Sequence, residues 1–133
     1  MQEQLIYDTD DVLRMLDALL VDRGGAWWNG FFSDRSKSCP FFVEWPDENL
    51  VEWFDEGLLT PEHVLELGCG HGRNAAFLAG MGCSVDAVDF SAEAIEWAVE
   101  RAKTAGVPVT FWCCSIFDAT IIQGTYDLVY DPG

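Results

Sequence analysis

The sequence predicts an α/β protein with a Rossmann-like, doubly wound parallel sheet behind an N-terminal helical extension rich in aromatic residues. Three observations predict this fold. A short apolar run leads into glycines at alternate positions and then into a helical pattern. A second apolar run ends in an acid and leads into another helical pattern. Two further β-forming runs follow, and such alternation is typical of parallel strands joined by crossover helices.

The first run, Val64 to Leu67, has the character of a buried strand. Gly68, Gly70 and Gly72 form a tight turn after it, and a helical pattern resumes from Arg73 to Met81. Glycine has no Cβ, so its backbone adopts positive φ and lets a ligand approach closely, next to the positive end of the following helix. The segment therefore predicts a nucleotide-binding loop.

The spacing of the glycines distinguishes two kinds of loop. The dinucleotide fingerprint G-x-G-x-x-G needs its third glycine at the position of Arg73. Here the third glycine comes one residue earlier, and Glu66 stands two positions before the first. This E-x-G-x-G-x-G pattern resembles motif I of the class I S-adenosylmethionine (SAM) methyltransferases. In that family the loop surrounds the methionine part of SAM, and the acid helps to orient the loop and the ligand's ammonium group.

The resemblance implies that the loop and the start of the next helix bind SAM through Glu66, Gly68, Cys69, Gly70, Gly72 and Asn74. The alternative is a strand-to-helix turn that binds no ligand. Cys69 has no evident base, so we expect a small loop residue rather than a nucleophile.

The second run, Cys83 to Asp89, adds a candidate ribose ligand. Asp89 follows Gly68 by 21 residues, close to the roughly 20 expected when a second-strand acid binds ribose hydroxyls. A carboxylate offers two acceptor oxygens to two neighbouring hydroxyl groups. We expect Asp89 to bind the ribose and Phe90 to lie against the adenine, with Ser91 as the N-cap of the next helix.

That helix is predicted from Ala92 to about Ala105, with Gly106 as its end. Its expected inward residues are Ile95, Ala98, Val99 and Ala102. A third strand is then predicted from Val107 to Cys114.

In the methyltransferases an acid after the third strand commonly binds the adenine amino group. Here Ser115 holds that position and Asp118 comes three residues later. Two alternatives stay open: Ser115 contributes its hydroxyl and Ile116 its backbone, or Asp118 makes the contact.

A fourth strand, Tyr126 to Tyr130, leads into Asp131-Pro132-Gly133. In the family the end of this strand faces the sulfonium and the acceptor, which makes Asp131 a candidate residue at the methyl-transfer point. The alternative is an Asp-Pro-Gly turn without a ligand.

A class I methyltransferase sheet normally has seven strands in the order 3-2-1-4-5-7-6, and only the first four are found here. An open edge on an apolar fourth strand is a liability that folded proteins avoid. The alternatives are the N-terminal part of a longer chain, an edge covered by a dimer partner or a further chain, and a truncated copy. We favour the first, with activity requiring the C-terminal half.

Composition narrows the function. No apolar run approaches 18 residues and no signal peptide is evident, so we expect a cytoplasmic protein without a membrane partner. Five cysteines lack C-x-x-C spacing, which predicts free thiols and no metal site. The net charge of −16 disfavours nucleic acid as a substrate. We expect a small-molecule acceptor.

Residues 1–61 precede the cofactor domain, which is assigned to residues 62–133. A first helix is predicted after Asp8 to Asp11, and its apolar stripe is expected to pack on another element. The stripe comprises Val12, Leu13, Met15, Leu16, Leu19 and Leu20. A later helix, Pro46 to Glu56, is expected to turn Leu50, Val51 and Phe54 inward.

Between these helices lies an aromatic cluster in a segment that we interpret as loop-like, residues 26–45. It is either core or a lid over the cofactor. The chain most resembles the thiopurine and tellurite methyltransferases, in which such an extension covers SAM, and this implies cofactor contacts from Trp28 and Phe32, whose faces attract a sulfonium. Arg35 is expected to pair with the methionine carboxylate or to form a surface salt bridge.

The predicted reaction is in-line displacement of the SAM methyl group by a small nucleophile, which leaves S-adenosylhomocysteine (SAH). Alignment alone supplies on the order of 7–11 kcal/mol, so no metal is needed. His63 and His71 are expected to be structural. Two alternatives are an NAD-binding oxidoreductase, against which the early third glycine and Glu66 argue, and a SAM-binding module without catalysis.

Overall fold

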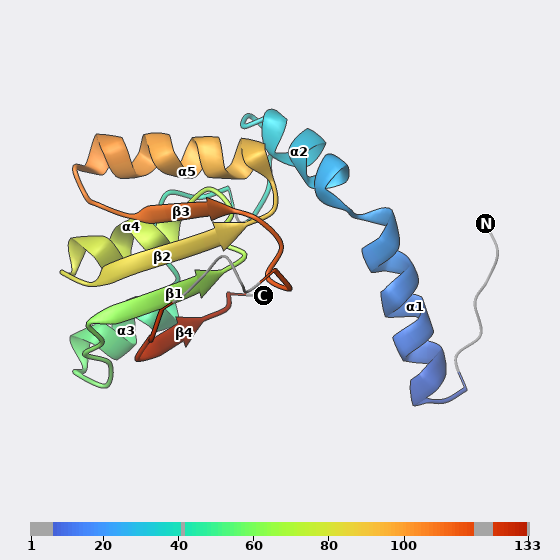
Figure 1. Ribbon diagram of the computed structural model, residues 1–133, viewed down its shortest axis with the longest axis horizontal. Helices are drawn as coiled ribbons and strands as arrows, with labels where there is room; N and C mark the ends of the chain where they lie inside the picture. Colours follow the sequence, from blue (N-terminus) through green and yellow to red (C-terminus); the bar gives the residue numbers. More distant parts are fainter. Residues whose placement is uncertain (1–6, 41, 119–123, 133) are drawn as a thin grey trace.

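The computed structural model describes residues 7–40, 42–118 and 124–132. Four parallel strands form one sheet in the order β3-β2-β1-β4 (Figure 1). Their bounds are β1 His63–Leu67, β2 Ser84–Asp89, β3 Thr110–Cys113 and β4 Leu128–Tyr130. The chain moves outward from β1 to β3 and returns to the other side of β1, so the strand order expected for the first four strands is confirmed.

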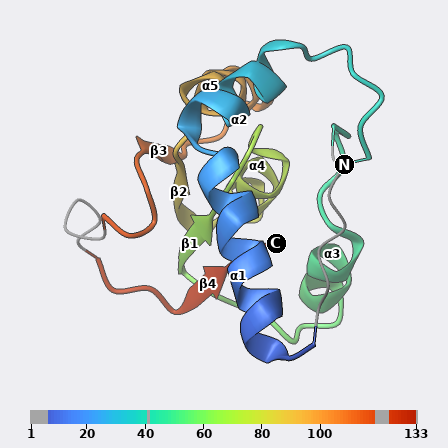
Figure 2. The ribbon, with the colours of Figure 1, turned by 90° about the vertical axis from the view of Figure 1, so that its right-hand side faces the viewer.

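Two helices connect the first three strands, α4 Arg73–Gly80 and α5 Ala92–Ala105. Together with α3 Glu48–Asp55 they lie on the same side of the sheet (Figure 2). The main core lies between these helices and the sheet, and its fully buried members include Leu50, Val64, Ala75, Leu78 and Ala87. Because the four strands run parallel, their carboxyl ends lie at one edge of the sheet, where ligands bind in such folds.

The ends of α5 agree with the expected capping residues. The Ser91 Oγ accepts a hydrogen bond from the Ala94 N–H, and Gly106 ends the helix with φ of 69°. The buried stripe differs from the expectation, because Val99 is exposed whereas Ala94, Ala98 and Ala102 are buried. Small alanine side chains let α5 approach the neighbouring loop closely.

The outer strands are shorter than predicted. β3 begins at Thr110 rather than Val107, and Pro108, which has no N–H to donate to a ladder, lies in the part that is not a strand. β4 begins at Leu128 rather than at Tyr126, and the Asp127 side chain before it bonds to the backbone at the start of β1. The Asp127 carboxylate accepts hydrogen bonds from the N–H groups of Glu62 and His63 at 2.9 and 2.7 Å.

The N-terminal extension forms α1 Thr9–Asp22 and α2 Gly25–Ser33. α1 projects away from the sheet in Figure 1, and Leu13 and Leu16 are exposed. The expected packing of the apolar stripe is therefore wrong for these two residues. No helix in the described part of the chain is long and apolar enough to cross a membrane.

The helix α2 shows that the loop-like interpretation is wrong for residues 26–33, whereas residues 34–40 and 42–45 contain no helix or strand. Trp27 stacks on Phe31 with ring centroids 5.4 Å apart, and Trp28 lies 6.1 Å from Phe32. Both pairs are spaced i, i+4, the spacing at which side chains meet on a helix. This spacing was the signal that could have identified α2 in the sequence.

Candidate functional site

The glycine loop joins the carboxyl end of β1 to the start of α4 and is hydrogen-bonded to the end of β2. Gly68, Gly70 and Gly72 all have positive φ, at 62°, 54° and 81°. The Cys69 N–H donates to the Val88 carbonyl, and the Gly70 N–H donates to Asp89 Oδ2, each at 2.9 Å. The Gly72 N–H also donates to the Cys69 carbonyl, so these three amides are bonded within the protein and the glycines provide shape and close approach.

The second half of the loop packs on α5. A Cβ added at Gly72 would lie 2.7 Å from the Ala98 Cβ, at a φ that L side chains rarely adopt. Only glycine fits this contact, because both the backbone conformation and the space exclude a side chain.

Gly72→Ala is therefore expected to lower the free energy of unfolding by about 2 kcal/mol, through left-handed strain and overpacking against Ala98. Urea unfolding followed by circular dichroism measures the change. Gly80→Ala is the matched control, since nothing lies within 4 Å of the added methyl group. Equal losses in the two variants would contradict the packing argument.

Asp89 lies where β2, the glycine loop and α5 meet. Its side chain is 8% exposed, and Oδ1 accepts from the Ser91 N–H while Oδ2 accepts from Gly70. Burial raises the pKa of Asp89, and these backbone hydrogen bonds oppose the shift. Each oxygen keeps a second lone pair, so the carboxylate retains the acceptor capacity that two ribose hydroxyls need.

The predicted adenine contacts gather at the adjoining ends of β2 and β3. The Cys114 N–H donates to the Asp89 carbonyl at 3.1 Å, which joins the two strand ends. Phe90 and Ile116 are exposed there. The Ser115 Oγ accepts from the Phe117 N–H at 3.2 Å, and the Asp118 N–H donates to the Ser115 carbonyl at 3.0 Å. Both adenine alternatives thus occupy one turn.

Glu66 is the most unusual group at this edge. It is 0% exposed, and among the described residues no donor lies within hydrogen-bond distance of either carboxylate oxygen, although the Asn74 amide is near enough to favour the charged form. Burial raises its pKa to about 8, with Asp47 adding to the shift and Asn74 and Arg73 opposing it. A buried, unpartnered carboxylate is costly and calls for a functional explanation.

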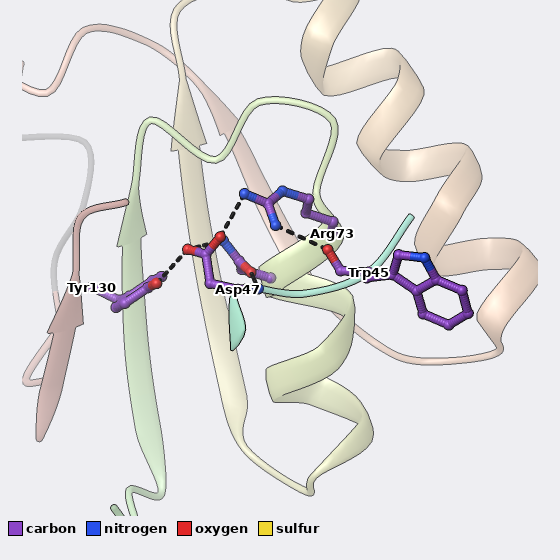
Figure 3. A network of polar contacts seen from close by, with 5 residues as sticks. Trp45, Asp47, Arg73 and Tyr130 are labelled. Atoms are coloured by element: carbon purple, nitrogen blue, oxygen red, sulfur yellow. Dashed lines mark hydrogen bonds and ion pairs between the residues drawn. The ribbon is translucent and has the colours of Figure 1, made fainter. Parts of the chain in front are cut away.

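A polar network adjoins Glu66 and was not predicted from the sequence. Asp47 Oδ1 pairs with the Arg73 guanidinium at 2.5 Å. The other oxygen, Oδ2, accepts from the Tyr130 hydroxyl at 2.5 Å and from the Asn74 side chain at 3.2 Å (Figure 3). Arg73 also donates to the Trp45 carbonyl at 2.9 Å. The network ties residues 45–47 to α4 and to the end of β4.

Asn74 contributes both ends of its amide to this network. Its Oδ1 accepts from the Asp47 N–H at 2.8 Å while its Nδ2 donates to the Asp47 carboxylate. The structure therefore gives this predicted cofactor residue a role in holding the segment before α3. One member of the network has a signal in the sequence, because Arg73 stands at the position where a dinucleotide loop has glycine.

The helix α2 covers the glycine loop. Phe32 is buried, and its ring lies 3.5 Å from the position of a Cβ at Gly70. The Asn29 Oδ1 accepts from the Ser91 hydroxyl at 2.8 Å, which holds α2 at the start of α5. Trp28 is half-buried beside Phe32. The aromatic residues of α2 thus pack on one another, and Phe32 is buried against the glycine loop while Trp27 is exposed.

Arg35 forms the surface salt bridge that was its alternative role. Its guanidinium pairs with Glu100 at 2.5 Å and lies 5.1 Å from the centre of the Trp97 ring. Asp131 is exposed just after β4. Burial raises the pKa of Cys69 well above its ordinary value, which keeps this side chain a neutral thiol.

The two histidines lie in different settings, His63 exposed at the start of β1 and His71 buried in the glycine loop. The described ranges contain no group of three or more His, Cys, Asp or Glu side chains placed to hold a metal ion.

A parallel sheet with a glycine loop after its first strand and a carboxylate ending its second defines an α/β protein built to hold a nucleotide cofactor. The family of methyltransferase domains matches residues 64–132, which is more than half of the chain. The chain belongs to this family, among the class I SAM-dependent methyltransferases, and the match decides against the NAD-binding alternative. The thiopurine and tellurite subtype stays a prediction.

Curated relatives include two ubiquinone biosynthesis O-methyltransferases. The one from Rickettsia felis is 31% identical over 107 residues, which cover 79% of this chain and 41% of the relative. The one from Rhizobium etli is 29% identical over 132 residues, which cover 91% and 53%. The chain thus spans about half the length of these relatives, and both matches extend into the N-terminal region.

Solved structures give the same fold. A structure from work on the conversion of a disulfide bond into a thioacetal group during echinomycin biosynthesis has a TM-score of 0.75 and 28% identity, covering 83% of this chain and 48% of the other. Magnesium protoporphyrin IX methyltransferase from Synechocystis PCC 6803, with bound SAM, has a TM-score of 0.54 and 26% identity, covering 63% and 41%. TehB from Haemophilus influenzae has a TM-score of 0.56 and 27% identity, covering 64% and 29%.

Proposed function

We propose that this chain forms the SAM-binding part of a methyltransferase that transfers a methyl group in line to a small-molecule acceptor, leaving SAH. The relatives named for ubiquinone biosynthesis support a small acceptor. The similar structures with bound SAM or SAH support the cofactor. The net charge of −16 supports an acceptor other than nucleic acid.

The observation that carries the proposal is the buried Glu66 carboxylate beside the glycine loop. An acidic side chain buried without a hydrogen-bond donor among the described residues is explained by a cationic ligand that lies against it and stabilises its charged form. The ammonium group of the methionine moiety meets this need. The glycines with positive φ leave the close approach that the rest of the ligand requires.

When bound, SAM supplies an electrophilic methyl group on a sulfonium. The residues of this chain bind and orient it. Glu66 faces the ammonium, Asp89 accepts from the ribose hydroxyls, and Phe90 lies against the adenine. Ser115, Ile116 or Asp118 contact the adenine edge, and Asp131 lies on the acceptor side. Such alignment accounts for on the order of 7–11 kcal/mol of the barrier.

The extension, residues 1–61, acts in this proposal as a lid on the cofactor domain, residues 62–133. The contact of Phe32 with Gly70 and the hydrogen bond of Asn29 to Ser91 support a lid. We further propose that a second copy of the chain or a further chain covers the side of β4 that pairs with no strand in the described residues, since apolar sheet edges are normally paired or covered. A cytoplasmic location remains part of the proposal.

Ligand-induced thermal stabilisation tests the cofactor assignment. SAH at about 100 times its dissociation constant is expected to add about 2.7 kcal/mol to the stability of the chain. NADH at the same concentration serves as the matched control and is expected to add nothing. Stabilisation by NADH, or none by SAH, would contradict the proposal.

A further inference from the structure

The half-buried Arg101 on α5 contacts His71 in the glycine loop twice. Its Nε donates to the His71 carbonyl at 3.1 Å, and an Nη lies 3.0 Å from the His71 Nδ1. A guanidinium has donors and no acceptor, so Nδ1 accepts and the imidazole proton resides on Nε2. The contact thus selects one neutral tautomer of His71.

Two aromatic rings also pack on the His71 ring. Trp97 stacks on it with centroids 4.4 Å apart and an interplanar angle of 26°, and Phe42 lies edge-on at 5.8 Å. The side chain is 3% exposed. A ring enclosed in this way has little freedom to turn, so the hydrogen bond from Arg101 acts on a fixed acceptor.

The peptide that joins His71 to Gly72 is fixed at both of its polar atoms. Arg101 holds the His71 carbonyl, and the Gly72 N–H donates to the Cys69 carbonyl at 3.0 Å. Gly72 packs directly on Ala98 of the same helix. The helix α5 therefore sets the second half of the loop, as β2 sets the first half through Val88 and Asp89.

We infer that Arg101 is a positioning residue for the cofactor, which acts by holding the loop from His71 to Gly72 in the shape that receives the methionine part of SAM. The inference rests on the proposed function and deepens it. The chain has only seven Lys and Arg residues, and one of them lies half-buried against this loop. Lysine cannot reproduce the fork that reaches both acceptor atoms.

The test uses the full chain as wild type, Arg101→Met, Arg101→Lys and the control Lys103→Met, which removes an exposed cation from the same helix. SAH affinity is measured by calorimetry. Long-range proton–nitrogen spectra report the tautomer of the two histidines, with the exposed His63 as internal reference. Circular dichroism reports folding.

In wild type we expect SAH binding and a neutral His71 protonated on Nε2. Arg101→Met should weaken SAH binding at least about tenfold and abolish the single tautomer. Arg101→Lys should recover part of the affinity, and Lys103→Met should match wild type. If wild type binds SAH and a folded Arg101→Met binds it with the same affinity, this inference is overturned but the proposed function is not. A wild type that does not bind SAH would overturn the proposed function as well.

If Arg101→Met does not fold, the inference is tested by the tautomer of His71 in wild type and by the SAH affinity of Arg101→Lys. A His71 ring protonated on Nδ1, or undiminished affinity in Arg101→Lys, would overturn the inference. The Nε2 tautomer together with weakened SAH binding in Arg101→Lys would support it.

Discussion

Asp47→Ala is expected to lower the free energy of unfolding by about 3 kcal/mol. The carboxylate joins Arg73, Asn74 and Tyr130 at distances of 2.5 to 3.2 Å. The Asp47 and Arg73 side chains are 24% and 17% exposed, so removal of the acid leaves a guanidinium, an amide and a phenol with little access to water. Loss of one partner from a buried charged network costs about 3–5 kcal/mol, and the partial exposure places this site at the lower end.

Urea unfolding of both Asp47→Ala and Asp55→Ala measures this effect. Asp55 lies exposed at the end of α3, so its replacement removes the same charge without touching the network and should change stability by less than about 0.5 kcal/mol. Tyr130→Phe should cost about 1 kcal/mol on its own, and less in the Asp47→Ala background, because the two side chains share one hydrogen bond. Additive losses would show that the contact between Asp47 and Tyr130 contributes nothing.

The parts of the fold that could be predicted are those with a local signal. The Ser91 cap, the Gly106 end and the apolar runs of β1 and β2 occupy the positions at which the sequence predicts them. The glycine loop and Asp89 were expected to lie close together, and one hydrogen bond joins them. The ligand roles of these residues stay predictions.

The Asp47 network shows what sequence patterns miss. Its hydrogen bonds span 27 residues from Asp47 to Asn74 and 83 residues from Asp47 to Tyr130. No periodicity links positions so far apart, and each residue has an ordinary local interpretation as a helix start or a strand residue. The helix α2 is a different case, because the sequence does contain the i, i+4 aromatic pairs that are typical of a helix.

Glu66→Gln is expected to stabilise the unliganded protein in mildly alkaline solution while weakening the binding of SAH. Burial raises the pKa of Glu66 from 4.5 to about 8. Between these values the folded protein holds the proton and the unfolded chain has released it, so this contribution to stability declines as pH rises through the window and is lost above pH 8. The full loss is about 5 kcal/mol at most, since each pKa unit corresponds to about 1.4 kcal/mol.

Unfolding of wild type and Glu66→Gln between pH 4.5 and 9 therefore tests both the burial of this carboxylate and its use. The two stabilities should agree at the acidic end and diverge as pH rises, with the variant more stable. Glu62→Gln removes an exposed carboxylate four residues earlier and should follow the wild-type curve. A neutral amide offers no charge to the ammonium group of SAH, so Glu66→Gln should lose most of the ligand-induced stabilisation. If the variant were more stable and still bound SAH as tightly as wild type, the unpartnered carboxylate would have no function at the cofactor site, since selection for function is the usual reason to retain such a costly group.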